Sequence, residues 1–371
     1  MNTTDVQGRI APHFQFDGEL CGIHEMTSGH INVTYRLEYA DGDGHKKAYT
    51  LQRINTVAFR DPASLMRNIG LVTEHIREKL VADGEDPARR VLHFVKADNG
   101  TLLYEDGEGG FWRAYGFVDH AIAYDKIEQP VHFYEAGRGF GLFQNALADF
   151  SAEALSETIP NFHDTPKRYE AFLEAVRRDA VGRAAEVSDE IAFFEERRDM
   201  MNLIVDGLAS GELPRRVTHN DTKMNNVLLD EQTGKAICVI DLDTVMPGSA
   251  LYDYGDAIRF GACTASEEEA DLEQIQVNME LFEAFTRGFL ETVGDRLTEA
   301  EIALLPVGAK MMACELSMRF LTDYLDGDVY FKTKYPTHNL VRAHAQMQLL
   351  RDMEKKEAAM AEVIRRIINQ R

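Results

Sequence analysis

Hydrophobic and polar residues follow two different patterns along the chain, strand-like at first and mostly helical later. Residues 35–42 and 46–55 are β-prone runs beside turn-forming Asp and Gly residues, which predicts an antiparallel hairpin. After Asp61 and Pro62, four apolar residues recur at helical spacing: Leu65, Ile69, Val72 and Ile76. Further strand-like runs lie at 91–97, 101–105 and 111–119. This part of the chain is therefore expected to form a sheet with a helix.

From about residue 130 the helical period dominates and continues to the C-terminal segment 339–370. One β-prone island, residues 217–248, interrupts it with two apolar runs around a turn at 231–234, which predicts a second hairpin. The sequence GRGFG at 137–141 lies inside an apolar helical pattern, and this placement predicts close helix packing.

These patterns predict an α+β fold with two unequal lobes. The chain has 371 residues, enough for two domains of roughly 150 residues each. Residues 1–118 would form a smaller N-terminal lobe of sheet plus helix. Residues 119–371 would form a mainly helical C-terminal lobe that contains the second hairpin.

Charge and cysteine usage narrow the possible functions. Lys and Arg number 40 and Asp and Glu number 62, so the net charge is −22 at pH 7. Such an acidic surface disfavours nucleic acid and anionic membranes as partners. The four cysteines are widely spaced, and the sequence shows neither a signal-peptide pattern nor an uncharged run of 18 residues. We expect a cytoplasmic protein that is a monomer or a weak homo-oligomer.

The second hairpin brings chemically useful residues together. If its turn is centred near Gln232 and Thr233, Asn226 faces roughly position 239 and Asp241 lies just beyond. Asp221 lies five residues before Asn226, in the preceding loop. Carboxylate and amide oxygens suit Mg²⁺ with nucleotide phosphates, and a further carboxylate can accept a hydroxyl proton. This arrangement predicts phosphoryl transfer from ATP, in which the metal brings an anionic nucleotide to an acidic protein.

Two motifs carry a family resemblance. His219 to Asn226, HNDTKMNN, resembles the H-x-D-x-x-x-x-N catalytic loop of aminoglycoside phosphotransferase and choline kinase relatives, and residues 240–243, IDLD, resemble their metal-binding I-D-x-D segment. The resemblance implies a bilobal protein-kinase-like fold, in which the lobe of residues 1–118 covers the nucleotide and the lobe of residues 119–371 carries the catalytic loop, the metal site and the sugar pocket. It also implies that Asp221 is the catalytic base, that Asn226 and Asp241 bind Mg²⁺, and that His219 and Asp243 support them.

A narrower resemblance concerns the acceptor. The stretches VIDLDTVMPG, YDYGDAIRFGA and ELSMRFLTDYLDGDVYF are similar to those of N-acetylhexosamine 1-kinases. This similarity implies phosphorylation of the anomeric hydroxyl of N-acetylglucosamine or N-acetylgalactosamine. It places five residues against the sugar, namely His30, Asp221, Phe260, Arg319 and Tyr330.

The resemblance also implies a set of nucleotide-binding residues, and the sequence departs from the family at one of these positions. A glycine-containing turn would cover the phosphates through Ser28, Gly29 and Asn32, and the segment of Phe117 and Val118 falls at the expected hinge beside the adenine. The third strand lacks the lysine that such kinases use for the α and β phosphates. It offers Gln52 or Arg53 instead.

Two alternatives stay open. The same fold could phosphorylate another acceptor, such as choline, homoserine, a thio-sugar or an aminoglycoside. The missing lysine also allows a nucleotide-binding pseudokinase.

Overall fold

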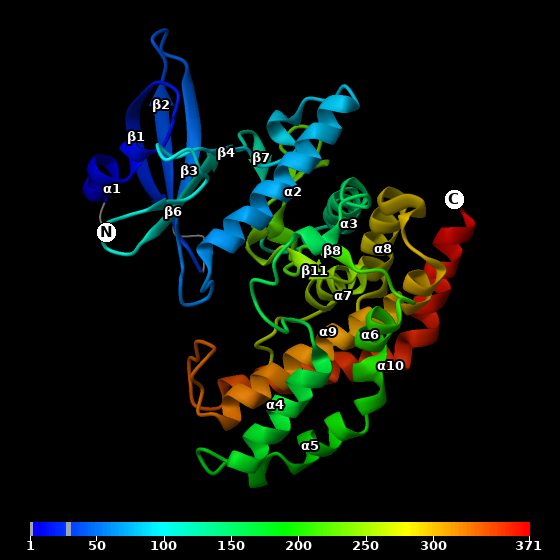
Figure 1. Ribbon diagram of the computed structural model, residues 1–371. Coiled ribbons are helices and arrows are strands. Elements are labelled where there is room, and N and C mark those ends of the chain that lie inside the picture. Colours follow the sequence, from blue (N-terminus) through cyan, green and yellow to red (C-terminus); the bar gives the residue numbers. More distant parts are fainter. Residues whose placement is uncertain (1–2, 27–30) are drawn as a thin grey trace. The chain divides into compact units, whose positions relative to one another are not determined.

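In the computed structural model, residues 3–26 and 31–371 are described (Figure 1). The chain forms two compact units: the first is Met1–Ile122, Glu153–Ile159 and Leu228–Met246, and the second is Ala123–Ala152, Pro160–Val227 and Pro247–Arg371. The mixed α and β architecture agrees with the predicted fold class. The lobe boundary expected at 118 stays a prediction.

The first unit is built on an antiparallel sheet. Its strands occur in the order β1 (Glu19–Met26), β2 (Val33–Ala40), β3 (Lys46–Ile54), β6 (Phe111–Gly116) and β4 (Phe94–Val95), and β5 (Tyr104–Glu105) also pairs with β6. The β2–β3 hairpin confirms the predicted one and closes with Ala40 opposite Lys46. Strands β4 and β5 are shorter than their apolar runs suggest.

One face of this sheet holds the core of the first unit. Strand alternation places Leu37, Leu51 and Trp112 on that face, where all three side chains are buried. Helix α1 (Thr3–Arg9) adds Val6 to the same core. The indole N–H of Trp112 donates to a carboxylate oxygen of Asp106 over 2.8 Å, so the one polar atom of this ring is satisfied.

Helix α2 (Pro62–Ala82) begins and packs as its sequence predicts. The Asp61 carboxylate caps the helix by accepting the N–H of Ser64, and the four apolar residues at helical spacing are buried. Asn68, also buried, donates to the carbonyl oxygens of Ser156 (2.7 Å) and Val245 (3.0 Å). This one side chain therefore joins α2 to both later segments of the first unit.

The second predicted hairpin is also confirmed. Strands β9 (Val227–Asp230) and β10 (Ala236–Val239) pair, and β7 (Ala121–Ile122) pairs with β9 on its other side. The N–H of Asp230 donates to the carbonyl oxygen of Lys235 over 2.8 Å, which is the predicted register. Asp230 also accepts the backbone N–H groups of Thr233 and Gln232, and these bonds together with Arg89 lower the pKa of Asp230 to about 2.

Helices dominate the second unit. They are α3 (Pro130–Ala146), α4 (Thr165–Arg178), α5 (Ser188–Glu195), α6 (Arg198–Ser210), α7 (Ala250–Gly261), α8 (Met279–Val293), α9 (Glu299–Leu325) and α10 (His338–Asn369). Two short strands, β8 (Arg216–Thr218) and β11 (Met246–Gly248), pair beside them. Helix α9 packs against α7, α4 and α10, as its orange ribbon beside the red α10 shows in Figure 1. No helix of the described chain is long and apolar enough to cross a membrane.

Helices α3 and α8 touch through glycines. A Cβ atom on Gly137 would overlap the carbonyl oxygen of Phe285, and one on Gly288 would overlap that of Tyr134. Gly141 meets the same helix one turn further along. The backbones can approach this closely only without side chains, which confirms the packing role predicted for the GRGFG segment.

Candidate active site

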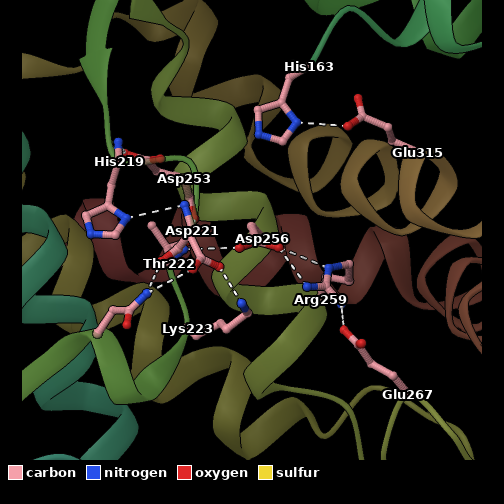
Figure 2. Close-up of polar contacts among 11 residues, drawn as sticks. His163, His219, Asp221, Thr222, Lys223, Asp253, Asp256, Arg259, Glu267 and Glu315 are labelled. Atoms are coloured by element: carbon pink, nitrogen blue, oxygen red, sulfur yellow. Dashed lines mark hydrogen bonds and ion pairs between the residues drawn. The ribbon is translucent and has the colours of Figure 1, made fainter. Parts of the chain in front are cut away.

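The loop after β8 holds Asp221 between two donors, as Figure 2 shows for the lysine. Its Oδ1 lies 2.7 Å from Nζ of Lys223, and its Oδ2 accepts from Nδ2 of Asn226 over 3.2 Å. The same Nδ2 donates to the Asp221 carbonyl oxygen over 2.8 Å. Burial alone would lower the pKa of Lys223, but the Asp221 carboxylate outweighs it and raises that pKa. Sequence reasoning brought Asp221 and Asn226 together but gave Lys223 no role.

A buried carboxylate on α7 fixes the backbone of this loop. Asp253 is 1% exposed and accepts the N–H groups of His219 (2.9 Å) and Asn220 (2.7 Å). The side-chain amide of Gln144 donates to it over 2.8 Å. Burial raises the pKa of Asp253. Asn220 has a left-handed backbone with φ of 63°, so these bonds hold a strained conformation immediately before Asp221.

The next carboxylate on α7 extends this support. Asp256 accepts the N–H of Thr222 over 3.1 Å and pairs with Arg259, which also bonds Glu267. Figure 2 shows this series of contacts from the catalytic loop to Glu267. Asp253 and Asp256 are three residues apart in the YDYGDAIRFGA stretch, so one helical face presents both to the loop. Sequence reasoning noted this stretch, but not that its carboxylates accept backbone N–H groups.

His219 is fully buried under the same loop. Its ring meets Phe140 and Phe143 edge-on, with centroid distances of 5.5 and 5.9 Å. Its Nδ1 accepts the N–H of Asp221 over 3.3 Å. These contacts suit a residue that braces the loop.

The first unit carries the second predicted motif. Asp241 is exposed and has a left-handed backbone, with φ of 57°, at the start of the short 3-10 helix Leu242–Thr244. Asp243 is buried, forms an ion pair with Arg113 and accepts from Nδ2 of Asn32 over 2.7 Å. Nε of Arg113 donates to Oε1 of Gln52 over 2.9 Å. Nothing in the sequence pattern had linked Arg113 to this motif.

The other expected nucleotide residues are placed as follows. Ser28 and Gly29, with the sugar candidate His30, lie outside the described residues. The N–H of Phe117 donates to Ala48, and Val118 beside it is half-buried. Arg53 follows Gln52 and therefore lies on the opposite face of the sheet, near Asp106 and Gly110.

The oxygen donors predicted to bind Mg²⁺ are divided between the units, with Asn226 in the second and Asp241 in the first. Because Nδ2 of Asn226 faces Asp221, its Oδ1 is left without a partner among the described residues. A carboxamide oxygen and an exposed carboxylate are each donors of the kind that a hard divalent cation prefers.

The acceptor candidates lie in the second unit. The guanidinium of Arg319 on α9 lies 5.7 Å from the ring centroids of both Phe162 and Phe331. It makes neither a hydrogen bond nor an ion pair with any described residue. Tyr330 is 72% exposed, and its ring meets that of Phe331 edge-on at 4.8 Å. Phe260 is half-buried at the end of α7.

The loop that carries Tyr330 is held by one carboxylate. Asp323 is 5% exposed and accepts three consecutive N–H groups, those of Val329 (2.9 Å), Tyr330 (2.7 Å) and Phe331 (2.9 Å), and the side chain of Asn339 (2.8 Å). The turn before them contains Asp328 in the left-handed region, with φ of 62°. An exposed aromatic side chain is thus presented on a rigidly held backbone.

Comparison with known proteins agrees with this architecture. The sequence model of the phosphotransferase enzyme family matches residues 22–287, more than half of the chain. A microcompartment-associated aminopropanol kinase has a similar structure, with a TM-score of 0.60, 16% identity, and coverage of 97% of this chain and 99% of that one.

Two further structures share the fold. An amicoumacin kinase in complex with AMP-PNP and Ca²⁺ gives a TM-score of 0.57 at 14% identity, with coverage of 89% of this chain and 90% of the other. The ethanolamine kinase of Plasmodium vivax gives a TM-score of 0.53 at 14% identity, with coverage of 88% of this chain and 82% of the other. At these identities the likeness shows the shared kinase-like fold. With the match over residues 22–287, it follows that this chain belongs to the phosphotransferase enzyme family.

Proposed function

We propose that the protein is an ATP- and Mg²⁺-dependent kinase that phosphorylates the anomeric hydroxyl of N-acetylhexosamines. The observation that carries the proposal is the position of Asp221, whose two carboxylate oxygens contact Lys223 and Asn226. Buried carboxylates on α7 hold the loop on either side of it. A proton acceptor fixed in this way is what transfer to a hydroxyl requires.

In this mechanism Asp221 orients the acceptor hydroxyl and accepts its proton as the hydroxyl oxygen bonds to the γ-phosphorus of ATP. The bond between that phosphorus and the β–γ bridging oxygen breaks, and ADP leaves. Lys223 lies beside that carboxylate and supplies positive charge where phosphoryl oxygens would gather. Asn226 and Asp241 are the proposed Mg²⁺ ligands, and the metal when bound would neutralise charge on the phosphates. His219 keeps the loop backbone in place through its contact with the Asp221 N–H.

The acceptor assignment rests on the sequence resemblance and on the chemistry of the α9 region. Arg319 has unused donors between two aromatic rings, and an exposed Tyr330 stands on the neighbouring loop. Hydrogen-bond donors and aromatic faces suit a neutral sugar with an acetamido oxygen. A cationic acceptor such as an amino alcohol would instead be repelled by an unpaired guanidinium.

The test is a panel of acceptors incubated with the full chain, ATP and Mg²⁺. The panel contains N-acetylglucosamine, N-acetylgalactosamine, glucosamine, choline, ethanolamine, homoserine, a thio-sugar and an aminoglycoside. We expect product only from the N-acetylated sugars, with phosphorus–carbon coupling in the NMR spectrum that places the phosphate on the anomeric carbon.

Two variants complete the test. Asp221→Asn should abolish transfer while nucleotide binding persists, and Asp206→Asn, at an exposed position on α6, should behave like the wild type. Phosphorylation of an amino alcohol and not of sugars would overturn the acceptor assignment. Nucleotide binding without transfer to any acceptor would instead support the pseudokinase alternative.

A further inference from the structure

We propose that Arg113 on β6 is the phosphate-binding cation of the first unit, in place of the third-strand lysine that the sequence lacks. This inference rests on the proposed kinase function and adds a nucleotide-binding residue to it. It concerns the nucleotide only and is independent of which acceptor the protein uses.

The position of Arg113 follows from strand register. Gln52 on β3 lies opposite Arg113 on β6, and Thr34 on β2 lies opposite Gln52. Nε2 of Gln52 donates to Oγ1 of Thr34 over 3.1 Å, and Oε1 of Gln52 accepts from Arg113. These three side chains form a polar row across the sheet, on the face opposite the core that holds Leu51 and Trp112.

The guanidinium of Arg113 is only partly used by the protein. One terminal nitrogen, Nη1, pairs with Asp243 and lies near the sulfur of Met66, and Nε donates to Gln52. The other terminal nitrogen, Nη2, has no partner within the described ranges. An arginine has five N–H donors, so a residue that is 3% exposed still offers donors to an added oxyanion.

The partner of this guanidinium links it to the predicted metal ligand. Asp243 lies two residues after Asp241, and Asn32 holds its second oxygen. One short segment of the first unit therefore presents a carboxylate for a divalent cation next to one that is paired with an arginine. Phosphate oxygens that bridge a metal ion and a cation are the usual arrangement in phosphoryl transfer.

Arg53, the arginine expected from sequence, has different surroundings. Strand alternation places it on the core face, where it lines a hollow with Ile31, Val33 and Gly110 and lies close to Asp106. A cation on that face cannot serve the same phosphates as the row of Gln52 and Arg113. The two arginines thus form a matched pair for an experiment, on one sheet but on opposite faces.

The experiment measures binding of Mg²⁺·AMP-PNP, Mg²⁺·ADP and adenosine to the full chain by calorimetry. We expect Arg113→Met to weaken the two phosphorylated ligands about tenfold or more, as the loss of one hydrogen bond to a charged group implies, and to leave adenosine binding unchanged. Arg53→Met should leave all three affinities unchanged. If Arg113 had a purely structural role, Arg113→Met would weaken the binding of adenosine as much as that of AMP-PNP.

Two further variants cover the risk that Arg113→Met leaves Asp243 buried without its partner and unfolds the protein. Arg113→Lys retains the charge without the planar fork, and Gln52→Lys with Arg113→Met restores a cation at the register partner. We expect Arg113→Lys to bind AMP-PNP several-fold more weakly than the wild type and the double variant to regain affinity.

A folded Arg113→Met variant with wild-type affinity for AMP-PNP would overturn the proposal, as would an Arg113→Lys variant that weakens adenosine binding as much as AMP-PNP binding, or an affinity loss confined to Arg53→Met. A wild-type protein that binds AMP-PNP through Arg113 but phosphorylates no N-acetylated sugar would contradict the proposed function alone.

Discussion

Replacement of Asp253 by asparagine tests how the catalytic loop is held. Oδ1 of Asp253 accepts the N–H of Asn220, and Oδ2 accepts both the N–H of His219 and the amide of Gln144. An asparagine keeps one acceptor oxygen, so its NH₂ group would face at least one N–H donor in either orientation of the amide. Hydrogen bonds to a charged group contribute about 1.5–3 kcal/mol each. Because burial raises the pKa of this carboxyl, relief of the buried charge offsets part of that loss.

We therefore expect Asp253→Asn to lower the free energy of unfolding by about 3 kcal/mol, roughly a hundredfold change in the unfolding equilibrium. Urea unfolding followed by circular dichroism measures this quantity. Since His219 and Asn220 directly precede Asp221, kcat should also fall at least about tenfold through misplacement of the base. ADP release in a coupled assay measures kcat.

Asp206→Asn is the matched control for this experiment. Asp206 lies exposed on α6 and has no hydrogen bond or ion pair within the described chain, so its replacement removes the same charge without a donor–donor contact. An Asp253→Asn protein that unfolds at the wild-type urea concentration would refute the reasoning about the buried acceptor. A destabilised variant with wild-type kcat would refute the link between loop backbone and catalysis.

Three further predictions follow from contacts in the second unit. Asp323→Asn should raise KM for the acceptor and leave KM for ATP unchanged, because the substitution loosens the loop that carries Tyr330. The rise in KM should vanish in a Tyr330→Ala background. Equal rises in both backgrounds would contradict this prediction. Hydrogen bonds from Lys334, the larger cause, and from Arg342 lower the pKa of Glu268 to about 2. The stability that ionised Glu268 contributes is therefore complete above its ordinary pKa of 4.5 and declines as pH falls toward 2. The melting temperatures of wild type and Glu268→Gln should therefore converge below pH 4.5, and a constant difference would be inconsistent with this ion pair. Gly288→Ala forces α8 away from α3 and should lower the free energy of unfolding in urea by about 1–3 kcal/mol. Gly42→Ala, at a glycine with open space around it and no left-handed backbone, should lack that penalty.

Features that depend on nearby residues could be predicted from the sequence. The β9–β10 register followed from turn residues at 231–234, and α2 followed from its Asp-Pro start and apolar spacing. Residues 219–226 could be singled out as a candidate catalytic loop because they lie within eight positions of one another. Each of these signals is complete within a short window of the chain.

Contacts between distant residues could not be predicted in this way. Arg113 and Asp243 are 130 residues apart. Asp253 accepts the N–H groups of His219 and Asn220, which precede it by 34 and 33 positions. Strand register decides that Gln52 rather than Arg53 shares a face with Arg113, and that register is set by β2 and β6. A single sequence shows that a lysine is missing, but not which strand supplies another cation.

The sole tryptophan gives the protein a natural reporter of one unit. Trp112 is fully buried in the first unit, and its indole N–H is fixed on Asp106. Its fluorescence therefore follows that unit, whereas the circular dichroism signal comes mostly from the helices of the second. Unfolding of the two units can be recorded separately in one unlabelled sample. A substitution that shifts one signal and not the other has acted on one unit alone.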